Sequence, residues 1–302
     1  MPHARAGSVS WSHATGVLPL DRPTLMAIVN VTPDSFSDGG RFGDVESVVS
    51  HARACLEQGA DILDVGGEST RPQGASRVSE QEELRRTIPV IDALRAALPG
   101  IVISIDTTKS AVARAALDAG ASIVNDVSGF RLDADMPALC AERGAGVVLM
   151  HSRGDVADMA TFAHAQYGDD PTADVIGELK ARVECARAAG VRDEQIVLDP
   201  GIGFAKRMQH SLTLLHDLPR MDALGFPLLV GASRKRFVGT LTGVDDPADR
   251  VFGTVGANVA ALDRGARIFR VHDVRANREA LDVAWAVASA NSSAAGQPAV
   301  RA

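Results

Sequence analysis

Three kinds of feature are scarce in this 302-residue chain, and each scarcity excludes a class of protein. The cysteines Cys55, Cys140 and Cys185 are scattered without metal-ligand spacing, which argues against a disulfide framework and a cysteine-held metal. No run of about 18 apolar residues occurs, so no transmembrane helix is expected. The opening residues have no apolar core of signal-peptide length. We therefore expect a cytoplasmic protein with small, reduced thiols.

Positive charge is also scarce. The formal net charge is −7 and the sequence pI is about 5.6, a balance that argues against general binding to nucleic acid or to an anionic membrane. A small anionic substrate stays compatible with this balance, because a local cluster of basic side chains can oppose the overall sign. Aromatic residues make up 4% of the chain, but 46% of it is hydrophobic, which is enough for a sizeable core.

The middle of the chain repeats one pattern: a short apolar run, a turn, and an Ala/Leu/Glu/Arg segment of helical period. The apolar runs are almost continuously hydrophobic, as expected for parallel strands that are buried on both faces. Several helical segments end in Gly just before the next run, a common stop signal. The predicted strands are residues 24–30, 61–66, 101–106, 122–126, 146–150, 195–199, 227–232 and 267–271.

Eight strands that alternate with helices over about 250 residues favour an α/β fold, a single-domain (β/α)8 TIM barrel. An open doubly wound sheet is the alternative. We assign the barrel to residues 24–288 and regard residues 1–23 as a patternless N-terminal extension. Residues 289–302 are small and polar and are expected to form a flexible C-terminal tail.

Polar side chains collect at the carboxyl ends of the predicted strands. In a barrel all these ends point to one mouth, where barrel enzymes place their active sites. Helix capping or a turn explains a single Asp or Asn at such a position, but it does not readily explain eight strand ends together. The set comprises Asn30, Asp64, Asp106, Asn125, Asp126, His151, Asp199, Ser233, Lys235, Arg270 and His272.

The first predicted loop, NVTPDSFSDGG (30–40), is long, polar and ends in glycine, features of a loop that can close over a substrate. The amide oxygen of Asn30 is a suitable hard ligand for Mg²⁺ that is shared with a diphosphate. Asp34 and Asp38 add carboxylates that can fold inward. A solvated Ω-loop is the alternative reading.

The second loop, DVGGESTRPQG (64–74), places Thr70 and Arg71 on an arm after a strand. Both side chains are natural partners for phosphate or carboxylate oxygens.

The motif DPGIGFAK (199–206) follows the sixth strand. Its Asp199 can accept two parallel N–H bonds from an aminopyrimidine edge, or it can simply cap a tight turn.

Basic motifs follow the last two strands, GASRKRF (231–237) and RVHDV (270–274). Many barrels build their phosphate site at this position. Arg270 and His272 lie two residues apart on one strand, so both side chains can face the same side.

Together, the strings NVTPDSFSDGG, DVGGESTRP and the SRK and RVHDV pair resemble the signatures of the dihydropteroate synthases, in order, across roughly residues 24–285. The resemblance implies a transferase that joins p-aminobenzoate to 6-hydroxymethyl-7,8-dihydropterin diphosphate and releases pyrophosphate, with Mg²⁺ as cofactor. The implied partners are these small molecules and a second copy of the chain, with no nucleic acid or membrane.

The resemblance also implies roles for individual residues. The pterin would be bound by Asp106, Asn125, Asp199 and Lys235, with Met150 and Phe204 packing on its faces. Asn30 would ligate Mg²⁺, and the diphosphate would contact Asn30, Thr70, Arg270 and His272. The p-aminobenzoate pocket would contain Phe36, Thr70, Arg71, Pro72, Ser233 and Arg236. The implied catalytic set is Asn30, Asp38, Lys235, Arg270 and His272, with Asp38 near the reacting methylene carbon.

Two features depart from the family pattern. Many members have a second Ser where this chain has Arg236, and residues 151–170 are longer and more acidic than expected. That segment is either a lid or an insertion on the outer wall. Three other functions stay open: a pterin-binding methyltransferase, a pterin-binding paralogue without activity, and a barrel enzyme that acts on a sugar phosphate.

Overall fold

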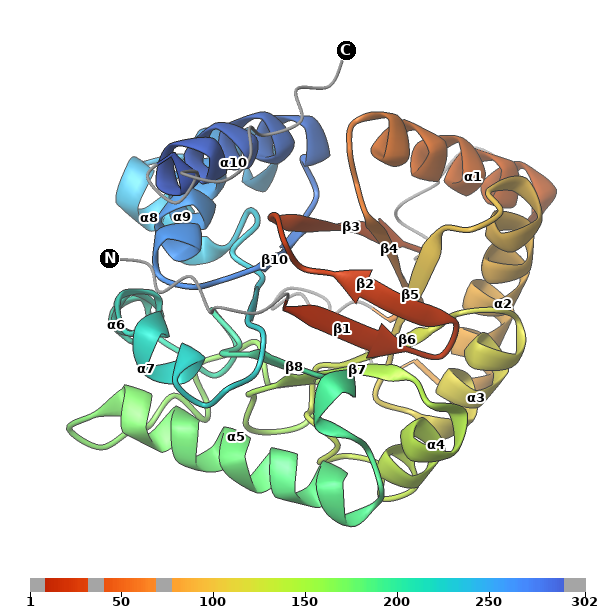
Figure 1. The fold of residues 1–302 in the computed structure, drawn as a ribbon, viewed down its shortest axis with the longest axis horizontal. Coiled ribbons are helices and arrows are strands. Elements are labelled where there is room, and N and C mark those ends of the chain that lie inside the picture. The colour runs from red at the N-terminus through yellow and green to blue at the C-terminus, as the bar shows by residue number, and fades with distance from the viewer. Residues whose placement is uncertain (1–8, 32–40, 69–77, 291–302) are drawn as a thin grey trace.

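The computed structural model describes residues 9–31, 41–68 and 78–290. Within this part of the chain, parallel strands form an eight-stranded sheet that curls into a barrel, with helices packed around the outside (Figure 1). The strands are β3 (Thr24–Asn30), β4 (Ile62–Gly66), β5 (Val102–Asp106), β6 (Ile123–Asp126), β7 (Gly146–Met150), β8 (Ile196–Asp199), β9 (Leu229–Val230) and β10 (Ile268–Val271).

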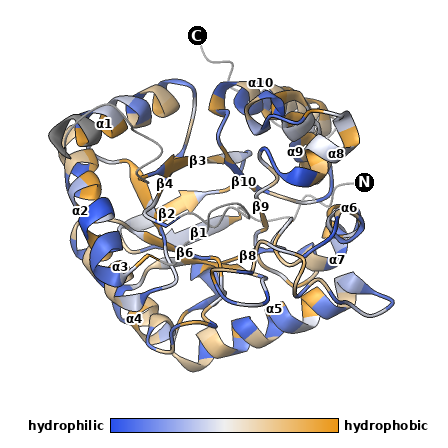
Figure 2. Ribbon diagram, turned by 180° about the vertical axis from the view of Figure 1, so that it is seen from behind, coloured by the Kyte–Doolittle hydropathy of each residue, from blue (hydrophilic) through white to orange (hydrophobic). Residues whose placement is uncertain are grey.

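Helices follow every strand of the barrel, as a (β/α)8 fold requires. Seen from the opposite side in Figure 2, outer helices such as α5 alternate between hydrophilic and hydrophobic bands, with one face turned to the sheet. The helices are α1 (Arg41–Glu57), α2 (Glu80–Ala97), α3 (Ser110–Asp118), α4 (Met136–Arg143), α5 (Pro171–Ala188), α6 (Met208–His216), α7 (Leu218–Asp222), α8 (Arg236–Thr242), α9 (Val251–Asp263) and α10 (Val274–Ser289), with short 3-10 helices η2 (Asp193–Gln195) and η3 (Pro247–Asp249).

The strand order is β8-β7-β6-β5-β4-β3-β10-β9, so neighbours in the chain are neighbours in the sheet. The ring closes between its two ends through a parallel bridge from Leu198 to Leu228, and the backbone N–H of Leu198 donates to the carbonyl of Pro227 at 3.0 Å. The barrel prediction is therefore confirmed, and the open doubly wound sheet is wrong.

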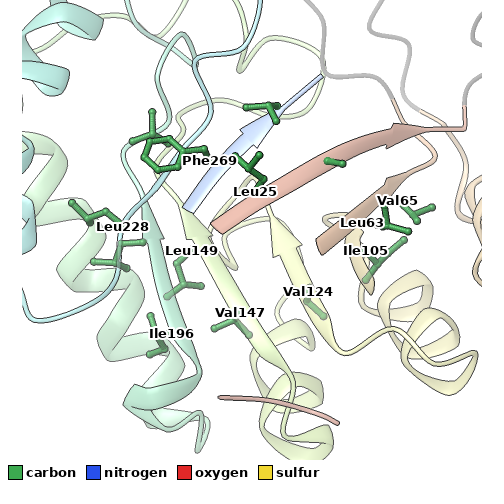
Figure 3. Packing of buried hydrophobic residues seen from close by; sticks show 14 of the residues in the cluster. Leu25, Leu63, Val65, Ile105, Val124, Val147, Leu149, Ile196, Leu228 and Phe269 are labelled. Carbon is green, nitrogen blue, oxygen red and sulfur yellow. The ribbon is translucent and has the colours of Figure 1, made fainter. Parts of the chain in front are cut away.

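The core of the protein lies between the barrel and its helices. Alternate strand residues, among them Leu63, Val124 and Leu149, point outward and are fully buried against the helices (Figure 3). The residues between them point into the barrel, because successive side chains of a strand face opposite sides. This alternation decides which polar residues reach the interior.

The N-terminal segment contributes more than the sequence analysis anticipated. Strands β1 (Ser10–His13) and β2 (Gly16–Pro19) form an antiparallel hairpin that lies across the near opening of the barrel in Figure 1. Trp11 is fully buried there, together with the innermost apolar residues of the strands, such as Met26, Ile62 and Val197. Its indole N–H donates to the carbonyl of Gln195 at 2.8 Å. The hairpin closes the end of the barrel opposite the strand carboxyl ends.

A glycine makes this close approach possible. At Gly146, the first residue of β7, a Cβ atom would lie 3.1 Å from the Cβ of His13, from the carbonyl oxygen of Ser12 and from the indole nitrogen of Trp11. Any side chain at position 146 would therefore push the hairpin away from the barrel.

Truncating Trp11 should reveal the contribution of the hairpin. Trp11→Ala is expected to lower the free energy of unfolding by about 3–5 kcal/mol, the usual cost of removing a large buried aromatic. Val17 lies on the same hairpin and is 60% exposed, so Val17→Ala should change the free energy of unfolding by less than about 0.5 kcal/mol. Urea unfolding followed by circular dichroism measures both variants, and equal stabilities would show that the hairpin is peripheral.

Among the described helices, none combines the length and the apolar character that a membrane span needs. The three cysteines are unpaired thiols, with Cys55 and Cys140 buried and Cys185 half-buried.

Candidate active site

The strand register places several predicted site residues side by side at the barrel mouth. Asn30 pairs with Gly66, Gly66 with Asp106, and Asp106 with Asn125, across four neighbouring strands. The adjacent residues on these strands, such as Ile105 and Val124, pack outward in the core. Asn30, Asp106 and Asn125 consequently line one arc of the interior.

Arg270 reaches from β10 past the neighbouring β3 to β4 and β5. Its Nε lies 2.6 Å from Oδ2 of Asp64, and one terminal nitrogen lies 2.6 Å from Oδ2 of Asp106. Asn125 donates to the same Asp64 oxygen at 3.1 Å. The structure therefore brings together Arg270, predicted to hold the diphosphate, and two residues predicted to bind the pterin.

Asp64 is the anchor of this network. Its carboxylate is fully buried, and its Oδ1 has no hydrogen-bond partner in the described part of the chain. From the sequence, Asp64 was predicted to end a strand, but its role as the shared acceptor for Arg270 and Asn125 was not predicted. A single sequence cannot reveal that role, because it depends on Arg270, 206 residues away.

Burial raises the pKa of Asp106 to about 7, and the nearby carboxylates of Asp64, Glu83 and Asp126 act in the same sense. The guanidinium of Arg270 acts in the opposite sense. At neutral pH the charge on Asp106 is therefore sensitive to the position of Arg270.

Asp199, Phe204 and Lys235 form the opposite side of the mouth. Asp199 is 5% exposed, and its Oδ1 accepts the backbone N–H of Gly201 at 2.7 Å. Lys235 donates to the carbonyl of Ile202, and its ammonium lies 4.2 Å from the centre of the Phe204 ring. This is a cation–π contact that fixes the ring beside the cation. Burial raises the pKa of Asp199, while the ammonium of Lys235 opposes that effect.

Met150 and Phe204 belong to a small apolar cluster at the mouth, with Val127, Val156 and Met159. Two of these come from the long segment 151–170, whose place the sequence left open. The carbonyl of Met159 accepts the backbone N–H of Ala205 at 2.6 Å. The segment thus lies against the mouth, and an insertion on the outer wall is wrong.

Ser233 and His272 meet where β9 and β10 end. The hydroxyl of Ser233 lies 3.0 Å from Nδ1 of His272 and accepts the backbone N–H of His272 at 3.1 Å. Between them, Arg234 has a positive φ of 57° and forms a two-point ion pair with Asp273, at 3.0 and 2.6 Å. The loop that carries Ser233 and Lys235 is therefore held rigidly.

The side chain of Arg236 turns toward the long segment. It donates to the carbonyl of Ala160 at 3.2 Å, and its guanidinium lies 4.3 Å from the centre of the Phe162 ring. The two departures from the family pattern, Arg236 and residues 151–170, are thus in contact with each other.

Two strand-end residues do not face the mouth as the sequence analysis expected. Asp126 accepts the backbone N–H groups of Ser128 at 2.7 Å and Phe130 at 3.0 Å, and so shapes the turn after β6. Burial raises its pKa to about 6.

His151 is buried between Glu178 and Lys206, behind the turn that carries Phe204. Lys206 was also missed, because a lysine in a glycine-rich turn gives no signal of burial.

Several predicted site residues lie outside the described part of the chain and stay predictions: Asp34, Phe36, Asp38, Thr70, Arg71 and Pro72.

The described residues contain no group of three or more His, Cys, Asp or Glu side chains that could hold a metal. Mg²⁺ does not require such a cage, because it often takes one or two protein oxygens and completes its shell with phosphate and water. The amide oxygen of Asn30 would lie 3.8 Å from a Cβ placed on Gly66, so it is directed along the arc at the mouth. This donor is compatible with the predicted ion.

Comparison with known proteins gives consistent results. A family model described as pterin binding enzyme matches residues 26–272. A dihydropteroate synthase of Synechocystis sp. is 48% identical over 270 residues, which cover 88% of this chain and 90% of the relative. The structure of a Xanthomonas albilineans dihydropteroate synthase with 4-aminobenzoic acid gives a TM-score of 0.86 at 46% identity, covering 94% of this chain and 99% of that chain. A structure from the same organism in complex with 7,8-dihydropteroate gives a TM-score of 0.80 at 44% identity, with 90% and 96% covered.

Proposed function

This chain belongs to the dihydropteroate synthases of the pterin binding enzyme family, and on that premise we propose how its barrel mouth carries out the reaction. The enzyme is a transferase of folate biosynthesis that condenses 6-hydroxymethyl-7,8-dihydropterin diphosphate with p-aminobenzoate, giving 7,8-dihydropteroate and pyrophosphate. One observation carries the assignment of roles: Asp106, Asn125 and Asp199 converge on the mouth from both sides.

The pterin lies between these two sides. Asp199 accepts hydrogen bonds from the aminopyrimidine edge through the oxygen that Gly201 leaves available, and Asp106 and Asn125 contact the opposite part of the ring. Phe204 and Met150 supply the apolar contacts, since both belong to the apolar cluster at the mouth. Lys235 lies beside the pterin, with its ammonium over the ring of Phe204.

The diphosphate extends toward β10. There Arg270 and His272 bind it, because Arg270 has a guanidinium fork suited to phosphate oxygens. Asn30 would hold Mg²⁺ through its amide oxygen, and the ion would neutralise part of the charge on the leaving group. Thr70, in the undescribed second loop, is a further proposed diphosphate contact.

The reaction breaks the C–O bond between the exocyclic methylene and the diphosphate, and forms a C–N bond to the arylamine. The electron-rich dihydropterin can stabilise positive charge on the methylene, so bond breaking can run ahead of attack. The arylamine is neutral and needs no strong base, and its surplus proton passes to water after attack. The main task of the protein is to stabilise charge on the departing diphosphate, through Arg270 and His272.

The p-aminobenzoate pocket lies beside Ser233 and Arg236. Ser233 is 7% exposed and already bound to His272, so it links this pocket to the diphosphate site. Arg236 stacks on Phe162 and brings a positive charge suited to the benzoate carboxylate. Phe36, Thr70, Arg71 and Pro72 complete the proposal, with Asp38 near the methylene carbon.

Pyrophosphate release tests the function directly. The purified protein is supplied with the pterin diphosphate, with and without Mg²⁺ and with and without p-aminobenzoate. Release that requires both, with dihydropteroate formed in equal amount, is the expected result. Pterin binding without turnover would instead identify an inactive paralogue, and product formation without Mg²⁺ would remove the ion from the proposal.

The pH dependence should reveal the charge on Lys235. Burial lowers the pKa of its ammonium to about 8, although Asp199 acts in the opposite sense. The group is charged below that pH and neutral above it, so kcat/KM for the pterin diphosphate should fall as the pH rises through about 8. In Lys235→Arg the guanidinium stays charged, so the fall should be much shallower even at a lower absolute rate. Identical alkaline profiles would contradict this role.

We also propose that the enzyme is a homodimer that pairs through α8 and α9. Phe252 is 89% exposed and Leu241 is 56% exposed, although both are large apolar side chains. Leu241 lines a groove of about 290 Å³ between α6, α8 and α9, together with residues that include Leu212 and Ala257, and Phe252 directly precedes Gly253 of the same lining. Large exposed apolar side chains beside a mainly apolar groove are typical of an interface between subunits.

A charge at this surface should separate the subunits. Phe252→Asp is expected to give a monomer in analytical ultracentrifugation, because a dimer would bury the new carboxylate. Val17→Asp, at the hairpin, is the matched control and should leave the mass unchanged. A wild-type monomer, or a dimer that survives Phe252→Asp, would contradict the proposed interface.

A further inference from the structure

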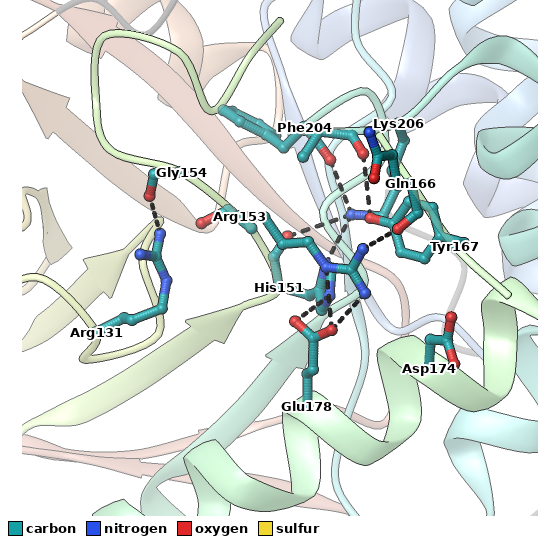
Figure 4. Close-up of polar contacts among 12 residues, drawn as sticks. Arg131, His151, Arg153, Gly154, Gln166, Tyr167, Asp174, Glu178, Phe204 and Lys206 are labelled. Carbon is teal, nitrogen blue, oxygen red and sulfur yellow. Dashed lines mark hydrogen bonds and ion pairs between the residues drawn. The ribbon is translucent and has the colours of Figure 1, made fainter. Parts of the chain in front are cut away.

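Lys206 is a buried lysine whose amino-group pKa is lowered well below its usual value by burial, and the reaction described above gives it no role. Lys206 is 2% exposed. The chain has three other lysines, and one of them, Lys180, lies on the exposed face of α5. Burying an ammonium is costly unless its N–H groups have acceptors. Here the acceptors are Nδ1 of His151 at 2.8 Å, the carbonyl of Phe204 at 2.9 Å and the carbonyl of His151 at 3.4 Å (Figure 4). None of the three carries a formal charge of its own.

These bonds join two loops of the mouth. His151 directly follows β7, and its backbone N–H donates to the carbonyl of Asp199 at 2.9 Å. Phe204 belongs to the turn after β8. Gly201, in the same turn, has a φ of 67°, and a Cβ there would collide with the carbonyl oxygen of His151. Lys206 therefore connects the turn of residues 200–206 to the end of β7, where Gly201 allows the two backbones to lie in direct contact.

The orientation of His151 is fixed from the other side. Its Nε2 lies 3.0 Å from Oε2 of Glu178 on α5, and Arg153 donates to the other oxygen of Glu178 at 3.0 Å. Burial lowers the pKa of His151 to about 4, with the Lys206 charge acting in the same sense, so the ring is neutral at pH 7. A neutral ring that donates from Nε2 to a carboxylate leaves the lone pair of Nδ1 for Lys206.

A second tie runs beside the first. Arg153 stacks over the ring of Tyr167 at 4.1 Å, and the Tyr167 hydroxyl donates to the carbonyl of Ala205 at 3.1 Å. Lys206 and Tyr167 thus hold consecutive carbonyl groups of one turn, those of Phe204 and Ala205. On its opposite face this turn presents the Phe204 ring and the carbonyl of Ile202 to Lys235.

We propose that Lys206, oriented by His151 and Glu178, is a positioning residue for pterin recognition, which holds the turn after β8 so that Asp199 and Phe204 meet the ring. The inference rests on the pterin site proposed above. It assigns Lys206 no contact with substrate. Its effect should therefore appear in the affinity for the pterin and leave the affinity for p-aminobenzoate nearly unchanged.

The test compares Lys206→Met with Lys180→Met, the same chemical change at an exposed position. Lys206→Met should raise KM for the pterin diphosphate by about tenfold or more, because misplacing a binding group by about 1 Å can cost about 10²-fold. KM for p-aminobenzoate should stay within about twofold. In ¹⁵N-histidine spectra, the Nδ1 signal of His151 should shift in Lys206→Met, since it loses its donor, and should not shift in Lys180→Met.

A pterin KM in Lys206→Met equal to that of Lys180→Met would overturn the proposal. If Lys206→Met does not fold, Glu178→Leu replaces it, since that carboxylate side chain is 43% exposed. Losing the acceptor at Nε2 should allow the proton of His151 to move to Nδ1 and oppose Lys206. A moved proton with an unchanged pterin KM would also overturn the proposal. If the wild-type protein shows no turnover, the proposed synthase function is contradicted. The histidine spectra test the contacts among Lys206, His151 and Glu178 independently of activity.

Discussion

Arg270→Ala is expected to lower kcat by on the order of 10²–10³-fold, the loss typical of removing one donor to charge that develops in a transition state. The affinity for the pterin diphosphate should fall by less, because Asp199, Asn125 and the apolar contacts remain. This separation follows from the position of Arg270, which reaches into the barrel from β10, the strand that His272 directly follows. Single-turnover measurements of pyrophosphate release, with substrate binding measured separately, distinguish the two effects.

The same substitution also affects stability, and the two losses must be separated. It leaves the carboxylates of Asp64 and Asp106 without their partner, and breaking a buried ion pair in this way typically costs about 3–5 kcal/mol. Arg270→Lys keeps a positive charge but loses the fork that bonds both carboxylates, so it should recover stability better than kcat. Wild-type kcat in folded Arg270→Ala would remove Arg270 from the chemistry.

Asp199→Asn is expected to weaken pterin binding by at least about 30-fold, since truncating one partner of a buried, hydrogen-bonded charge pair costs about 2–5 kcal/mol. The substitution preserves shape but introduces an NH₂ group. That group either faces the donors of the aminopyrimidine edge or displaces the N–H of Gly201, which now bonds Oδ1 at 2.7 Å. In either arrangement one donor at a nearly closed site lacks an acceptor.

Isothermal titration of the pterin diphosphate measures this loss without p-aminobenzoate. The matched control is Asp193→Asn, which changes the same group in an exposed ion pair with Arg187. It should leave the pterin affinity as in the wild type, because a surface pair contributes little. Equal affinities for Asp199→Asn and Asp193→Asn would mean that the ring is bound elsewhere in the mouth.

The sequence was sufficient to predict the barrel strands because parallel strands buried on both faces are almost continuously apolar. Residues 24–30 and 146–150 were predicted with the bounds that the structure has. The strand predicted at 227–232 is only Leu229–Val230, and the proline at its start has no backbone N–H to donate. The hairpin of residues 10–19 was missed because its strands have four residues each, too few for a clear period.

At the site, the sequence predicted which side chains reach the mouth but not how they pair. Asn30, Asp106 and Asn125 lie at strand ends, and strand ends in a barrel share one mouth. The contact of Arg270 with Asp64 depends on the width and stagger of the ring, which local patterns do not contain. Burial of Lys206 likewise depends on how two loops meet, and composition alone favours a solvated lysine.

The hairpin at the barrel floor also constrains the order in which the chain can fold. Trp11 emerges from the ribosome early, yet its hydrogen-bond partner Gln195 lies 184 residues later. Until β7, β8 and η2 exist, a nascent chain lacks the elements against which the strand of Trp11 packs, and contacts of such long range form slowly. Trp11 is therefore expected to be a late reporter of folding, whose fluorescence changes only when the ring closes. Trp285, the other tryptophan, lies on the C-terminal helix and reports the docking of that helix instead.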